Sequence, residues 1–166
     1  MFLYGINTFM DKDYITTELK KWIVDFLEKP NPLLGDWAPC PYARQARINN
    51  KIYIDFELSN IYKALPLLEQ YDVLVICYDH NKISAESFRS YAENLNNDLL
   101  QNNYVVLEDH PDATERINNV VMNFGLCALL FIQKKDKLAQ ASQQLKSKGY
   151  YSVWTEEELE EVVNWR

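Results

Sequence analysis

The spacing of hydrophobic positions changes from segment to segment along the chain, and this spacing predicts alternating helices and strands. Between residues 13 and 29, apolar side chains recur at helical intervals with charged residues between them, which is typical of an amphipathic helix. Residues 51–58 alternate apolar and polar side chains, as in a strand with one solvated face. Residues 73–78 and 126–132 are continuously apolar, which indicates strands buried on both faces.

The rest of the chain gives the same kind of signal. A strand is predicted at residues 104–107, and a short helix is predicted between Ile61 and Gln70. Ser84 is expected to cap a longer helix, and Gly149 is expected to end another. Near the end of the chain, Thr155 and Glu158 have the spacing of a capping box, in which each residue's side chain bonds the other's backbone N–H.

These elements predict an α/β (or α+β) fold, because strands that alternate with helices favour a sheet with helices packed on it. We expect a single compact domain over residues 1–166, with about four mostly parallel strands. Its expected parts are an N-terminal helix at about 13–29, a linker at 30–39, a sheet-and-helix core at about 40–148 and a C-terminal helix at about 155–165.

Composition narrows the function classes. The 166 residues carry a net charge of −7 without a Lys/Arg-rich run, so a nucleic-acid partner is not expected. No signal peptide or membrane-spanning stretch is evident, and three cysteines fit free thiols in a reducing compartment, so we expect a soluble, cytoplasmic protein. Only 4 glycines are present, and the Gly-rich phosphate-binding motifs are absent.

Both histidines follow predicted strands and are flanked by carboxylates. His80 comes directly after Asp79, and His110 lies between Asp109 and Asp112. If the sheet is mostly parallel, these strand ends meet at the edge where ligands usually bind. The alternative is structural, since Asp112 has the spacing of a helix cap and a histidine can simply occupy a polar loop.

A cysteine between two prolines forms a second candidate. Pro41 is suited to the first position of a helix, which would make Cys40 the N-cap and lower the pKa of its thiol. Arg44 and Arg47 would share one helix face and hold an anionic group. The alternative is that Cys40 is a small cap packed beneath Trp37.

The other two cysteines, Cys77 and Cys127, fall inside apolar strands and are expected to be inert. The stretch Cys40-Pro41-Tyr42-Ala43, followed by two arginines, resembles the active-site turn of glutaredoxins and omega-type glutathione transferases. In those families, a cysteine at a helix N-terminus attacks glutathione disulfides. The resemblance is confined to this turn.

A broader resemblance is to a family of small bacterial proteins of unknown function. Those proteins combine a tryptophan, a Cys-Pro-Phe-Ala turn and a His-Pro-Asp near the end of a later strand. The matching positions are Trp37, Cys40 to Ala43, and His110 to Asp112, with a further apolar strand after them. The resemblance implies that the cysteine turn and the His-Pro-Asp belong to one site.

The first of three functional hypotheses is an enzyme acting on a small anionic substrate. Cys40 would be the nucleophile or redox thiol, and His110 its acid or base, with Asp112 or Asp109 orienting the imidazole. Arg44, Arg47 and Trp37 are the expected substrate-binding residues.

The second hypothesis is a metal site, and the third is a binding role. His80 and His110 would hold zinc or iron, helped by Asp79, Asp109 or Cys40, although the sequence requires no cofactor. In the third hypothesis the chain is a non-catalytic partner subunit or adaptor, supported by its acidic, aromatic-rich composition. Partners are therefore a small molecule or another protein, and a homo-oligomer is left open.

Overall fold

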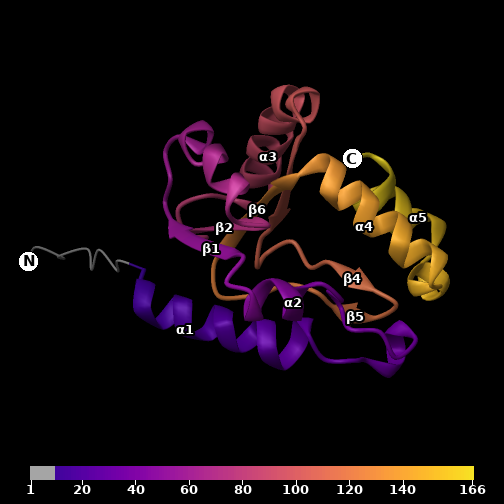
Figure 1. The fold of residues 1–166 in the computed structure, drawn as a ribbon. Coiled ribbons are helices and arrows are strands. Elements are labelled where there is room, and N and C mark those ends of the chain that lie inside the picture. The colour runs from indigo at the N-terminus through magenta and orange to yellow at the C-terminus, as the bar shows by residue number, and fades with distance from the viewer. Residues whose placement is uncertain (1–9) are drawn as a thin grey trace, which may run out of the picture.

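A four-stranded sheet forms the centre of the computed structural model, which describes residues 10–166 (Figure 1). The strands lie in the order β1-β2-β6-β3. Strands β1 and β2 are parallel, whereas β6 is antiparallel to both of its neighbours. The bounds are Ile52–Phe56 for β1, Val73–Tyr78 for β2, Tyr104–Asp109 for β3 and Ala128–Lys134 for β6.

The α/β class, the single domain and the four-stranded sheet are confirmed, but the prediction of a mostly parallel sheet is wrong. The sheet is mixed because β6 inserts between β2 and β3 and runs against both. Parallel strands need a long crossover, usually a helix. The segment between β3 and β6 has no crossover helix, so the chain returns in the opposite direction.

One face of the sheet is covered by α3 (Ala85–Leu99) and by the short 3₁₀ segments η3 (Ile61–Lys63) and η4 (Leu65–Glu69). Ser84 caps α3 as predicted, since its hydroxyl accepts the N–H of Ser87 at 3.2 Å. The largest core cluster lies here. Its fully buried members include Leu68, Leu74, Ile76, Phe88, Leu99, Leu130 and Ile132.

The opposite face is covered by α1 (Lys12–Trp22), its π-helical continuation η1 (Ile23–Leu27) and α2 (Ala43–Ile48). In Figure 1, α1 and α3 lie on opposite sides of the sheet. The second core cluster fills this side. It includes Ile15, Leu19, Ile23, Val75, Cys77, Cys127 and Leu129.

The remaining elements extend beyond β3 at the right of Figure 1. They bury a third, smaller cluster centred on Leu34, Ile117 and Val120. The C-terminal helix begins at the predicted capping box, since Thr155 and Glu158 bond one another's backbone N–H groups. These elements are η2 (Pro32–Leu34), the hairpin of β4 (Arg116–Ile117) and β5 (Val120–Val121), α4 (Lys135–Ser147), η6 (Tyr150–Val153), α5 (Glu156–Leu159) and η7 (Glu160–Asn164). The short segment η5 (Leu100–Asn102) instead continues the end of α3.

A buried asparagine closes part of the outer edge of β3. Asn96 of α3 accepts the N–H of Val106 through its Oδ1 at 2.8 Å. Its Nδ2 donates to the carbonyl of the same residue, also at 2.8 Å. One side chain thus replaces the neighbouring strand that Val106 lacks, which keeps both buried backbone groups paired.

Candidate functional site

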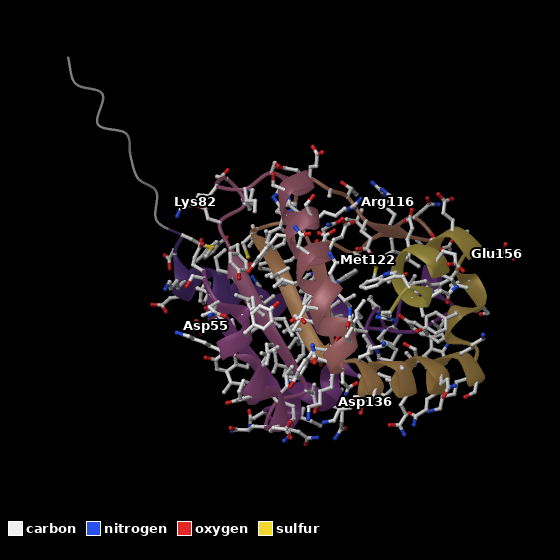
Figure 2. The ribbon with its side chains drawn as sticks, turned by 90° about the horizontal axis from the view of Figure 1, so that it is seen from above. Asp55, Lys82, Arg116, Met122, Asp136 and Glu156 are labelled. Atoms are coloured by element: carbon white, nitrogen blue, oxygen red, sulfur yellow. The ribbon has the colours of Figure 1, made fainter. Side chains whose placement is uncertain are left out.

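A cleft of about 1130 Å³ opens along β3 between the sheet and the C-terminal helices. Leu107 and Phe131 contribute apolar surface from adjacent strands. Cys40 lines it from the turn before α2, and Trp165 from the end of the C-terminal helix. Met122, labelled in Figure 2, lies beside the cleft between α3 and those helices. The cleft therefore combines apolar surface with side chains from four distant parts of the sequence.

Acidic residues outnumber basic ones around this cleft. The two arginines are Arg89 and Arg116, and Arg89 is already paired, with its Nε 3.3 Å from Oε1 of Glu108. The excess of carboxylates gives the cleft a negative potential, which disfavours an anionic ligand. The lining carboxylates are Glu93, Glu108, Asp109, Glu115, Glu158 and Glu161.

Asp109 has a structural role at the end of β3. It is buried, and its Oδ2 accepts the N–H of Phe124 at 2.9 Å, while its Oδ1 accepts from Nδ2 of Asn123 at 2.6 Å. Burial raises the pKa of Asp109, and these two hydrogen bonds oppose the rise. Both oxygens are engaged, so Asp109 ties the strand to the segment that leads into β6.

Glu115 is the most chemically distinctive group in the cleft. Its backbone N–H donates to Oδ1 of Asn123 at 2.7 Å, which fixes the residue beside Asp109. Burial, aided by the charges of Asp109, Glu108 and Glu161 and opposed by that of Arg89, raises the pKa of Glu115 to about 7. A carboxyl with such a pKa exchanges protons near neutral pH, unlike an ordinary glutamate.

Cys40 lines the cleft, but not in the way its sequence predicts. Helix α2 begins at Ala43 with Tyr42 as its N-cap, and the Cys40 carbonyl accepts the N–H of Ala43 at 3.0 Å in a preceding turn. Cys40 is exposed to solvent as a residue, while neighbouring atoms of the cleft surround its thiol. Burial raises its pKa, opposed by hydrogen bonds from the N–H groups of Tyr42 and Ala43. The predicted N-cap and lowered pKa are therefore wrong.

His110 also lines the cleft, but its ring is fully buried. Its Nε2 lies 2.9 Å from the carbonyl oxygen of Ile83, which can only accept a hydrogen bond. Its Nδ1 accepts the N–H of Asp112 at 3.1 Å. These two bonds fix the neutral tautomer with the proton on Nε2. No ring nitrogen remains free to act as a base, so the geometry gives His110 a structural role.

The carboxylate expected to orient His110 faces solvent. The Asp112 side chain is 73% exposed, and its Oδ2 lies 4.0 Å from Nδ1 of His110. The structural alternative, in which Asp112 caps a helix, is also wrong, because a turn leads here into the β4–β5 hairpin instead of a helix.

The two histidines lie near one another without forming a metal site. The ring centroids of His80 and His110 are 6.2 Å apart. Asp79 is buried, and its Oδ1 accepts both the backbone N–H and Nδ2 of Asn81 at 3.0 and 3.1 Å. Within residues 10–166, no three or more His, Cys, Asp or Glu side chains are grouped so that they could hold a metal ion. The geometry thus gives no support to a metal centre built on Asp79, His80, Asp109 and His110.

The residues expected to bind substrate lie outside the cleft. Arg47 forms a bidentate pair with Glu28, with Nε 2.5 Å from Oε1 and Nη2 2.9 Å from Oε2. Arg44 is exposed, and its charge helps to lower the pKa of Glu28. Trp37 packs edge-on against Tyr150, with ring centroids 5.6 Å apart. The two arginines therefore stabilise the junction of η1 and α2 and do not clamp a ligand in the cleft.

Sequence reasoning missed Glu115 because it missed the hairpin that follows it. The turn of that hairpin is Asn118-Asn119, with φ angles of 42° and 66°. Two asparagines between Ile117 and Val120 are a recognisable signal for a hairpin turn, because asparagine tolerates positive φ. This signal would have placed Glu115 at the start of a hairpin beside the end of β3.

No family model, curated protein or solved structure matches the chain. The resemblances to the glutaredoxin-type turn and to the Trp, Cys-Pro, His-Pro-Asp pattern therefore stay predictions. Among the helices of residues 10–166, none has both the length and the apolar character needed to cross a membrane.

Proposed function

We propose that the chain is a small enzyme that binds its substrate in the cleft along β3 and uses Glu115 to exchange a proton with it. The observation that carries the proposal is the position of Glu115, a partly buried carboxyl with a pKa raised to about 7, in a cleft of about 1130 Å³. General acid–base catalysis is most effective when the pKa of the group lies near the working pH.

The surroundings of Glu115 support this role. Asp109 is anchored by two hydrogen bonds, and Asn123 accepts the backbone N–H of Glu115. These bonds hold the backbone that carries the Glu115 carboxyl in place. The neighbouring Glu108 is paired with Arg89. Hydrogen bonds oppose the rise in the pKa of Asp109, whereas Glu115 reaches about 7, and two carboxyl groups in such different environments are a common basis for separate acid and base roles.

The charge of the cleft changes the expected substrate. The sequence favoured an anionic substrate held by Arg44 and Arg47, but neither arginine lines the cleft. The acidic lining favours an uncharged or cationic small molecule instead. The apolar surface of Leu107 and Phe131 suits a ligand with a hydrophobic part.

A second candidate uses Cys40 as the nucleophile. The support for this second candidate is that Cys40 lines the same cleft and that its sulfur accepts hydrogen bonds from the N–H groups of Tyr42 and Ala43. Its raised pKa means that the thiol is protonated at neutral pH, so a base must remove the proton before attack. His110 has no free ring nitrogen for this step, which leaves the carboxylates of the cleft as acceptors.

We also propose a cytoplasmic location. Its support is that all three cysteines are free thiols. Cys77 and Cys127 are not joined in a disulfide even though their side chains are within hydrogen-bond contact. A reducing compartment keeps such neighbouring thiols from oxidising.

A fragment screen followed by amide chemical shifts in NMR spectra tests the proposal. Amines, polyols and carboxylic acids are added separately to the wild-type protein. We expect uncharged or cationic fragments to shift the amides of Leu107, Glu115 and Phe131, and Glu115→Gln to remove the pH dependence of their binding. Shifts confined to other surfaces, or binding by carboxylic acids alone, would contradict it.

The two chemical candidates are separated by matched variants. Cys40→Ser keeps the size of the side chain but removes the nucleophile, and Glu115→Gln keeps the shape but removes the titrating group. If Glu115 is the acid–base group, fragment binding in Cys40→Ser retains its pH dependence and binding in Glu115→Gln loses it. The reverse pattern would assign the site to the thiol.

A further inference from the structure

The two outer edges of the sheet differ in whether their outward backbone groups are hydrogen-bonded. On β3, both outward backbone groups of Val106 are bonded to Asn96. On β1, no side chain of residues 10–166 covers the centre of the strand in a comparable way. This edge lies on the far side of the sheet from the cleft, and Figure 2 labels Asp55 of β1 and Met122 of the cleft on opposite sides of α3.

The backbone bonds of β1 show which groups face outward. The N–H of Glu57 donates to Cys77 of β2, and the carbonyl of Lys51 accepts from residues 72 and 73. Because bonding alternates along a parallel strand, Tyr53 and Asp55 also bond to β2, whereas Ile52, Ile54 and Phe56 direct their N–H and C=O groups away from it. The N–H of Phe56 is bonded to the Oδ1 of Asp55 at 2.7 Å.

We propose that this free edge pairs with the β1 strand of a second copy of the chain, in antiparallel register centred on Ile54. The two four-stranded sheets would join into one across a two-fold axis. The inference does not depend on the proposed function, since β1 contributes no residue to the cleft.

The sequence of β1 is complementary to itself in this register. Ile54 faces Ile54 of the second copy, and Ile52 faces its Phe56, so apolar side chains meet on one face of the sheet. On the other face, Tyr53 lies opposite Asp55 of the second copy. Within one chain the Tyr53 hydroxyl already donates to Asp55 at 3.1 Å, so the two groups are compatible partners.

Charge also favours a second copy as the occupant. Just beyond the two ends of β1, the same register brings Lys51 of each chain to the same end of the interface as Glu57 of the other, and within β1 no two like charges are directly opposed. Ile54 contributes outward N–H and C=O groups from both copies, which gives two hydrogen bonds at the centre. Because the N–H of Phe56 is bonded to Asp55, it must leave that carboxylate to pair across the interface.

A single pair of short strands forms a weak interface, well below the ~1,200 Å² of stable complexes. The dimer is therefore expected to depend on concentration. Sedimentation equilibrium of the full-length protein should show an average mass that rises from 19.6 kDa toward twice that value as the concentration increases.

Ile54→Pro is the sharpest variant, because it removes an N–H that faces away from β2. Proline is tolerated on edge strands where the N–H faces solvent, so the bonds between β1 and β2 are retained. We expect dimerisation to weaken by more than about tenfold, since the central pair loses both symmetric hydrogen bonds. A wild-type protein that stays monomeric, or a variant that dimerises as well as the wild type, would overturn the proposal.

Amide hydrogen exchange of the wild-type protein gives a second test that needs no substitution. The N–H of Ile54 should become protected as the protein concentration rises. The N–H of Tyr53, which bonds to β2, is the matched control and should be protected equally at all concentrations. Exchange at Ile54 that does not change with concentration would exclude pairing through β1.

Discussion

Replacing Asn96 by alanine tests how the outer edge of β3 is stabilised. The asparagine is buried and makes two hydrogen bonds of 2.8 Å to the backbone of Val106. Val106 is itself only 1% exposed, so water cannot easily replace these bonds. The substitution thus leaves one N–H and one C=O without partners in the interior.

The size of the effect follows from these two groups. Leaving a buried polar group unpaired costs about 1–3 kcal/mol. Two such groups, partly relieved by local movement, give an expected loss of about 2–4 kcal/mol in the free energy of unfolding. For a chain of this length, that corresponds to a fall in Tm of roughly 5–15 °C.

Urea denaturation followed by circular dichroism measures this loss, with Asn97→Ala as the matched control because Asn97 is the exposed neighbour on the same helix. Asn96→Asp adds a second check. Its carboxylate still accepts from the N–H of Val106 but repels the carbonyl, and protonation at low pH restores a donor. A loss below about 1 kcal/mol in Asn96→Ala would mean that both backbone groups of Val106 find other partners, and that Asn96 does not stabilise the edge of β3.

Three further predictions concern the thiols, the pH dependence and the core. Iodoacetamide should label Cys40 in the native protein, with a pH midpoint above the ordinary thiol value, whereas Cys77 should react only after denaturation; native labelling of Cys77 would contradict its burial. The folded-state pKa of Glu115 lies above its ordinary value of 4.5, so the folded state binds the proton more tightly and the free energy of unfolding falls as pH rises from about 4.5 to about 7. Glu115→Gln should remove about 2–3 kcal/mol of this fall, measured by urea denaturation across pH, whereas the exposed Glu86→Gln should leave it unchanged. Leu130→Ala should cost about 2–4 kcal/mol in the same assay because Leu130 is fully buried, and a cost below about 1 kcal/mol would contradict close packing.

Local patterns predicted local elements well. The limits of β2 at residues 73–78 match the continuously apolar run, and the caps at Ser84 and Thr155 follow from side-chain chemistry within one turn. These features depend on neighbouring residues alone. The direction of β6 was predicted wrongly because it depends on how the chain returns after β3, which the apolar pattern of the strand does not encode.

The candidate site was harder to predict for a related reason. Cys40 and His110 line one cleft. However, His110 is buried, and both of its ring nitrogens are bonded to backbone groups, those of Ile83 and Asp112. A residue type such as histidine indicates what chemistry is available, not whether its nitrogens are free. Glu115 gains its raised pKa from burial and from charges on β3 and the C-terminal helix, which only tertiary packing brings together.

We propose that Glu115 exchanges a proton near neutral pH within the cleft, and its carboxyl carbon reports this directly. In a protein with ¹³C-labelled glutamate, the Glu115 signal is identified as the resonance that disappears in Glu115→Gln, and its chemical shift is followed as a function of pH. We predict a midpoint of about 7. Glu161→Gln should lower this midpoint, since it removes one of the charges that raise the pKa of Glu115. A Glu115 carboxyl that titrates near 4.5, like an exposed glutamate, would contradict its proposed acid–base role.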